Sequence, residues 1–96
     1  MKKIPEDARM IARWCDDSIP VTDFNFREEI LYEHEGLFYL YVYGDFVPTP
    51  LNGWVQSENI ERVNADRAIE WINEGFSGTR AAELVAEVEN IRSGRV

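Results

Sequence analysis

Few residues of this chain could carry out catalysis or bind a metal, since it has one histidine, His34, and one cysteine, Cys15. His34 is predicted at a hairpin tip, with no serine or cysteine nearby to act as a nucleophile. The flanking Glu33 and Glu35 are expected to point in divergent directions, and no second histidine or cysteine completes a metal shell. Residues 75–78 lack the lysine of a phosphate-binding loop. We therefore expect no enzyme, no metal site and no cofactor. Paired carboxylates for glycoside hydrolysis stay an open alternative, although a domain this small offers little room for a deep cleft.

Carboxylates are the one reactive group that the chain has in quantity. It holds 18 acidic and 10 basic side chains, for a net charge of -8. Residues 14–61 concentrate this charge, because ten acids there face the single base Arg27, for a net charge of -9. Such a field attracts basic protein surfaces and repels nucleic acid and anionic lipid. We expect a basic protein partner, with no direct nucleic-acid or membrane binding; acidity that serves only solubility is the alternative.

Two arrangements could turn these acids into a binding surface. Three acids recur at every fourth residue of a predicted helix, about 6 Å apart, which is of the same order as the spacing of phosphates along a nucleic acid. In a predicted hairpin, two glutamates share a face with three tyrosines, which are large contact residues of low entropy. The alternatives are an ordinary charged helix face and a sheet face covered by another segment. The predicted partner-binding set is Asp16, Asp17, Glu28, Glu29, Glu33, Glu35, Asp66, Glu70, Glu74, Tyr39, Tyr41 and Tyr43.

The elements that position these residues follow from local patterns. Pro5 opens a predicted helix that ends near residue 17, with apolar residues at helical spacing. Strands are predicted at 30–33 and 37–43 around a three-residue loop with Gly36 in the left-handed conformation, so that Ile30 and Tyr32 share a core face with 38, 40 and 42. A long loop over 44–53 leads to a short strand at 54–56. Asn64 caps a helix over 65–74, and a last helix spans 79–93.

These elements predict an α+β fold for residues 1–96 as one domain: a small antiparallel three-stranded sheet with an N-terminal helix and two C-terminal helices. The lone Cys15 excludes an internal disulfide and favours a cytoplasmic setting, and the amino terminus has the pattern of neither a signal peptide nor a membrane span.

Small size, acidity, a single α+β domain and the lack of catalytic groups together resemble the small phage-encoded anti-CRISPR proteins, several of which are DNA mimics. The resemblance implies an inhibitor that competes with nucleic acid for a basic groove of an effector complex. The same traits are similar to acidic immunity proteins and antitoxins, which bind a nuclease or toxin. A protein interaction module that binds through a tyrosine-rich sheet face is the alternative, and the chain could be a monomer or a homodimer.

Overall fold

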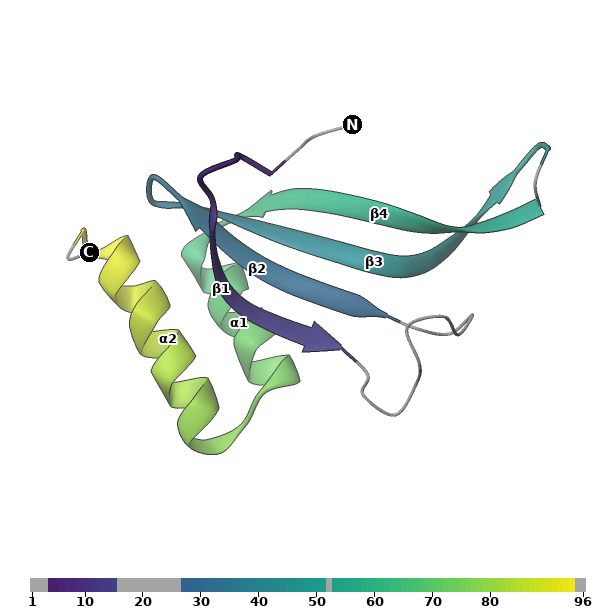
Figure 1. Cartoon of the computed structure of the whole chain (residues 1–96). Helices are drawn as coiled ribbons and strands as arrows, with labels where there is room; N and C mark the ends of the chain where they lie inside the picture. The colour runs from purple at the N-terminus through teal and green to yellow at the C-terminus, as the bar shows by residue number, and fades with distance from the viewer. Residues whose placement is uncertain (1–3, 16–26, 52, 95–96) are drawn as a thin grey trace.

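Four antiparallel strands are followed along the chain by two helices (Figure 1). The computed structural model describes residues 4–15, 27–51 and 53–94. The strands lie in the order of the sequence, each paired with the next. This confirms the α+β class and the two C-terminal helices, but the three-stranded sheet and the N-terminal helix are wrong. The elements are β1 (Arg9–Cys15), β2 (Glu28–His34), β3 (Leu37–Thr49), β4 (Gly53–Val63), α1 (Ala65–Gly75) and α2 (Gly78–Arg92).

The predicted N-terminal helix is strand β1 because a β-bulge imitates helical spacing. The register of β1 against β2 shifts between Met10 and Ala12. A bulge inserts one extra residue and breaks the alternation of a strand. Here it leaves the consecutive residues Ile11 and Ala12 both buried. Apolar residues at 8, 11, 12 and 15 therefore match a helix pattern, although the backbone is extended.

The predicted long loop over 44–53 is instead the outer half of a long hairpin. β3 pairs with β4 from Phe38↔Val63 out to Thr49↔Gly53, whereas β2 accompanies β3 only as far as Tyr43. Residues 45–51 and 53–57, here named the arm, therefore extend beyond the rest of the sheet (Figure 1). Proline is tolerated in such an edge position, where strands have fewer neighbours. Prolines at 48 and 50 and the Asn-Gly pair at 52–53 predicted a loop, but residues 45–49 pair with residues 53–57 as a two-stranded ribbon.

The turn between β2 and β3 has two residues and not three, and this changes which side chains of β2 share a face with those of β3. His34 pairs with Leu37, so the loop is Glu35 and Gly36 alone. Both have positive φ, 52° and 81°, as the two central residues of a type I′ turn require. Gly36 is left-handed as predicted. Because side chains alternate, a shift of one residue moves the whole of β2 to the opposite face of β3.

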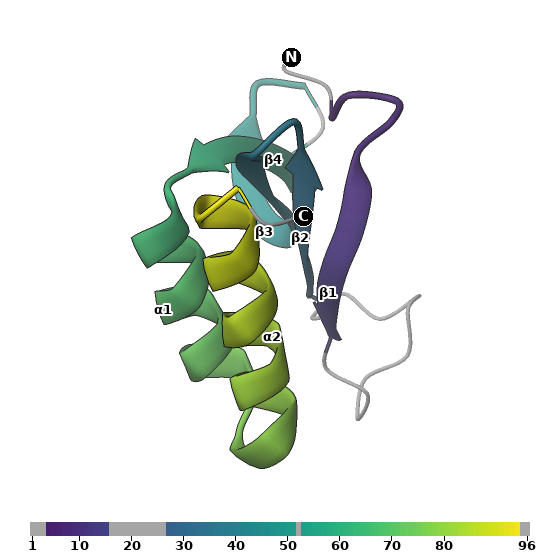
Figure 2. The same ribbon diagram turned by 90° about the vertical axis from the view of Figure 1, so that its left-hand side faces the viewer.

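The two helices pack side by side against one face of the sheet, giving two layers (Figure 2). The α1 helix begins as predicted, with the backbone N–H of Arg67 donating to the Asn64 side chain at 2.8 Å. Gly75 is the last residue of α1, where an added Cβ would lie 3.4 Å from the Trp14 ring, so a small residue suits this contact. The core between the layers consists of Ile11, Ala12, Leu31, Phe38, Leu40, Ala68, Trp71, Ile72, Ala81, Leu84, Val88 and Ile91.

Candidate interaction surface

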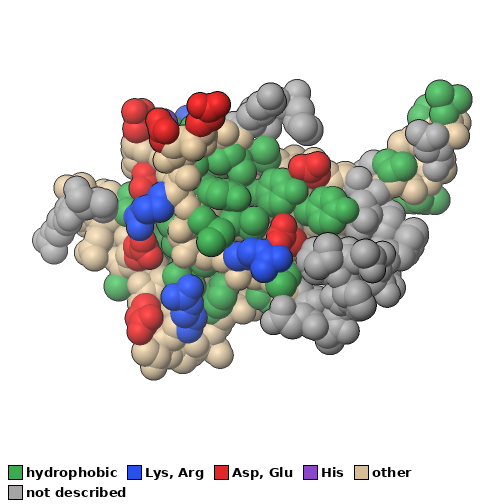
Figure 3. Space-filling model, viewed as in Figure 1, with side chains coloured by type: hydrophobic (Ala, Val, Ile, Leu, Met, Phe, Trp, Pro, Cys, Tyr) green, Lys and Arg blue, Asp and Glu red, His purple; other side chains and the backbone are tan. Residues whose placement is uncertain are grey.

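The sheet face opposite the helices gathers all four tyrosines of the chain. Three rows of paired residues cross it, and alternation places them on the side away from Leu31 and Leu40, which contribute to the core. Hydrophobic side chains cover the middle of this face (Figure 3). We name this surface the tyrosine face. Its rows are Met10–Tyr32–Tyr39–Arg62, Arg13–Ile30–Tyr41–Ile60 and Cys15–Glu28–Tyr43–Glu58.

Charged groups lie at both edges of the tyrosine face. Glu28 forms an ion pair with Arg13 on the neighbouring strand β1. At the other edge, the Tyr41 hydroxyl donates to Glu58 Oε2 at 3.1 Å. Burial, followed by this hydrogen bond and the negative charge of Glu58, raises the pKa of Tyr41 to about 12. Tyr41 is therefore a neutral donor at physiological pH, and its hydroxyl holds the Glu58 carboxylate beside the aromatic surface.

Glu29 and Glu33, which were predicted to flank the tyrosines, lie on the helix side of the sheet. The corrected register pairs Glu33 with Phe38, whose side chain is in the core. The Glu33 carboxylate lies 3.7 Å from Arg9 and also accepts the backbone N–H of Gly36 at 3.2 Å, within the turn. Its side chain is only 12% exposed. This glutamate is therefore a structural group that holds the turn and not an exposed anion.

Glu29 is held by a tryptophan and an arginine. The indole Nε1 of Trp71 donates to Glu29 Oε1 at 3.0 Å, and Arg27 Nε donates to Oε2 at 3.1 Å. A hollow of about 300 Å³ lies beside this group, lined also by Trp14 and Arg67. In the part of the chain that the structure describes, no buried side-chain nitrogen or oxygen lacks a hydrogen-bond partner.

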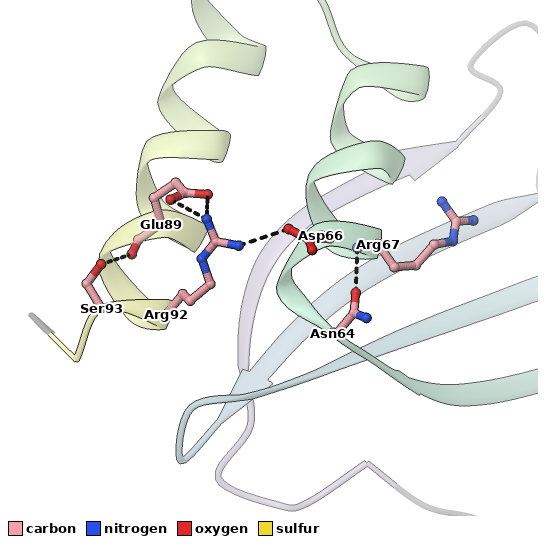
Figure 4. A network of polar contacts seen from close by, with 6 residues as sticks. All are labelled: Asn64, Asp66, Arg67, Glu89, Arg92 and Ser93. Atoms are coloured by element: carbon pink, nitrogen blue, oxygen red, sulfur yellow. Dashed lines mark hydrogen bonds and ion pairs between the residues drawn. The ribbon is translucent and has the colours of Figure 1, made fainter.

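The carboxylates of α1 are exposed, but arginines bridge them. Arg67 Nη1 lies 3.2 Å from a carboxylate oxygen of Glu70 and 3.1 Å from one of Glu74. Arg92, at the end of α2, donates to Asp66 at 2.9 Å across the helix pair (Figure 4). The hydrogen bond and charge of Glu89, with a smaller contribution from Asp66, raise the pKa of Arg92. The row of carboxylates at every fourth residue is thus present in the helix but carries two positive partners.

The predicted acidic set does not form one continuous anionic surface within the described residues. Glu28 lies on the tyrosine face, Glu29 and Glu33 lie on the helix side, and the three acids of α1 lie in the other layer. Glu35 is exposed in the turn, and of the described acids in the set it alone has no contact with a described arginine. Asp16 and Asp17 lie outside the described residues. Of the predicted contact residues, the structure therefore brings together Tyr39, Tyr41 and Tyr43 with Glu28 alone.

Of the twelve residues in the rows of the tyrosine face, the predicted set contains four. The eight that sequence reasoning missed include Tyr32 and Ile30 from β2, and Ile60 and Glu58 from β4. The two β2 residues were assigned to the core because a three-residue loop was assumed, although Glu-Gly is also compatible with a two-residue turn. The two β4 residues were missed because 57–63 carries Glu58, Glu61 and Arg62 and so lacks a strong strand pattern. Their alternation, with Ile60 and Arg62 on one face, was the available signal.

Comparisons with known proteins offer no identification, as no family model, curated protein or solved structure matches this chain. Within the described residues, no three histidine, cysteine or acidic side chains come together in a way that could hold a metal ion. Nor does any described helix have the length and apolar character needed to cross a membrane.

Proposed function

We propose that this protein is an interaction module that binds another protein surface through the tyrosine face. The observation that carries the proposal is the convergence of four partly exposed tyrosines and Ile60 around the buried Ile30, on the sheet face that the helices leave uncovered. Tyrosine supplies a large contact area at a low cost in side-chain entropy, and it is enriched at the residues that dominate binding energy.

The charge around the tyrosine face supports protein recognition over competition with nucleic acid. Arg13 and Arg62 balance Glu28 and Glu58 on this face, so it is apolar and neutral in the middle of an acidic molecule. Apolar centres with a polar rim are typical of protein–protein interfaces. The remaining acidity then serves solubility and the exclusion of nucleic acids. A cytoplasmic setting belongs to the same proposal.

A comparison of two double variants tests the proposal. Tyr39→Ser/Tyr41→Ser removes the centre of the face, whereas Glu70→Lys/Glu74→Lys changes the charge of α1 by four units and leaves the face intact. Tagged wild-type and variant proteins are used to capture partners from a cell lysate, with circular dichroism as the check on folding. We expect the tyrosine variant to lose its captured partners and the helix variant to keep them.

The same experiment includes the DNA-mimic hypothesis as an outcome. Duplex DNA added during capture displaces a partner that uses its basic groove, because the two ligands then compete for one site. Loss of capture by the helix variant together with displacement by DNA would support charge mimicry and contradict binding through the tyrosine face.

A further inference from the structure

The exposed large hydrophobic residues of the described chain lie at two opposite ends of the tyrosine face. Met10 and Leu37, 54% and 41% exposed, lie at the end beside the β2–β3 turn. Leu51 and Trp54, 93% and 64% exposed, lie on the arm at the other end. Trp54, like Ile60, is an even-numbered residue of β4, and the arm that carries it begins at a register shift between Tyr43 and Asp45 and twists until β3 and β4 cross (Figure 1). If two copies packed face to face with their strands running in opposite directions, the arm end of each copy would meet the turn end of the other.

The charges on the tyrosine face also favour an arrangement in which two copies face each other with their strands running in opposite directions. The row Arg13–Ile30–Tyr41–Ile60 lies midway between the other two rows. A two-fold axis along this middle row, lying between two facing copies, exchanges the outer rows and sets Arg62 of each copy opposite Glu58 of the other. The same axis sets the two copies of Arg13 opposite each other, each in an ion pair with its own Glu28. An axis along the strands instead sets Arg62 opposite Met10. Among the residues that the structure describes, none forms an ion pair with Arg62, so its charge is available to a second copy.

We propose that the partner of the tyrosine face is a second copy of this chain, packed face to face about the middle row, with each arm reaching the Met10 and Leu37 end of the other copy. This inference rests on the proposed function and names its partner. Two sheets packed in this way keep their strands within about 30° of each other, which is the ordinary geometry of a β-sandwich. The interface is isologous, since the same surface is used on both copies.

The size of the face explains why the arm takes part. Four strands about 4.8 Å apart and seven residues of about 3.3 Å each give a flat area of roughly 400 Å². A stable complex buries about 800 Å² on each partner, so the sheet face alone is too small. The arm lengthens β3 and β4 by a further stretch of ribbon and adds Trp54, a residue type that often dominates interface energy. A two-stranded ribbon is marginally stable alone, and packing on a second copy stabilises it.

Electrostatics also favours this face as the meeting point of two like-charged copies. Each chain carries a net charge of -8, so most of their surfaces repel each other. The tyrosine face is the exception, since two arginines and two glutamates balance on it. Its opposite charges are arranged so that a reversed copy presents Glu58 to Arg62, and this fixes the register of the pair.

A charge-swap series tests the inference with the purified chain alone. Sedimentation velocity should show wild type moving from 11.2 kDa to twice that mass as its concentration rises. Glu58→Arg and Arg62→Glu should each weaken the dimer at least tenfold. An equal mixture of the two single variants should dimerise again, because the introduced arginine of one variant then faces the introduced glutamate of the other, and the native Arg62 faces the native Glu58. Glu61→Arg, which makes the same charge change on the neighbouring residue of the opposite face, is the matched control and should leave the dimer intact.

The remaining outcomes separate the two proposals. A wild-type chain that stays monomeric at millimolar concentration overturns the dimer, whereas loss of a captured partner in Tyr39→Ser/Tyr41→Ser would still support the tyrosine face as a binding site. A dimer that both the charge swaps and the tyrosine variant leave unchanged shows that another surface is used, and it overturns the face-to-face arrangement. Trp54→Ser, whose side chain is mostly exposed in one copy, should weaken the dimer without lowering the stability of the monomer.

Discussion

At the level of single residues, Tyr41 links the aromatic surface to its charged rim. Its pKa of about 12 means that the folded state favours the neutral phenol. This contribution to stability is complete below the ordinary tyrosine pKa of about 10 and is lost as the pH rises through about 12. The protein should therefore become less stable across that alkaline range, and Tyr41→Phe should make the loss shallower.

Glu58→Gln should lower the pKa of Tyr41, because it removes the negative charge beside the phenol while leaving its burial unchanged. The ultraviolet absorbance of tyrosinate during an alkaline titration measures this shift directly. Tyr41→Phe serves as the control, since it identifies the step near pH 12 as that of Tyr41. A titration of Glu58→Gln in which that step does not move would show that the carboxylate has no influence on the phenol.

Trp71 combines two roles, and substitution can separate them. Its ring packs edge-on against Phe76 with centroids 5.7 Å apart, and its Nε1 donates to Glu29. Trp71→Phe keeps an aromatic ring but removes the donor to a charged, largely buried acceptor, which should cost about 1.5 kcal/mol of unfolding free energy. Urea unfolding followed by circular dichroism measures the loss. In the Glu29→Gln background the same substitution should cost less, because the acceptor there is neutral; an equal cost would assign the effect to packing alone.

At the level of elements, α1 begins where its cap predicts. Asn64→Ala removes the acceptor of the Arg67 N–H bond and should destabilise the protein by about 1 kcal/mol. In a chain of this size that corresponds to a fall in melting temperature of about 4–8 °C. Asn64→Asp keeps an acceptor at the same place and should retain nearly all of the stability. Equal melting temperatures for the alanine variant and wild type would show that the cap contributes nothing.

The helices could be predicted from sequence because their signals are local. The Asn64 cap and the stripe predicted for the last helix, Ala81, Leu84, Val85, Val88 and Ile91, each lie within one element. The structure confirms the cap and buries the stripe, with Val85 only partly buried. The β-sheet depends on pairings between distant residues, which no local pattern reports. A single bulge at Met10 and Ala12 turned a strand into an apparent helix, and one residue in the β2–β3 turn exchanged the faces of β2. The candidate site depended on that turn, so Tyr39, Tyr41 and Tyr43 were grouped correctly while their β2 neighbours were not.

At the level of the whole molecule, two electrostatic contributions act over different distances: attraction within arginine–carboxylate pairs, and repulsion among the excess acids. Attractive pairs such as Arg67 with Glu74 and Arg92 with Asp66 act over about 3 Å. The excess of eight acids acts over the breadth of a molecule that measures 48 × 29 × 20 Å. Salt screens the second part first, because the Debye length falls from about 30 Å at 0.01 M to about 8 Å at 0.15 M ionic strength.

Raising sodium chloride from 0.01 to 0.15 M should therefore stabilise the protein, shown by a higher midpoint of urea unfolding. The measurement belongs at a protein concentration where sedimentation shows only the 11.2 kDa species, since screening would also favour association of two acidic copies. Potassium chloride should give the same rise, because screening depends on ionic strength and not on the cation. A midpoint that falls over this range would mean that the arginine bridges dominate the electrostatic free energy and that self-repulsion among the acids is negligible.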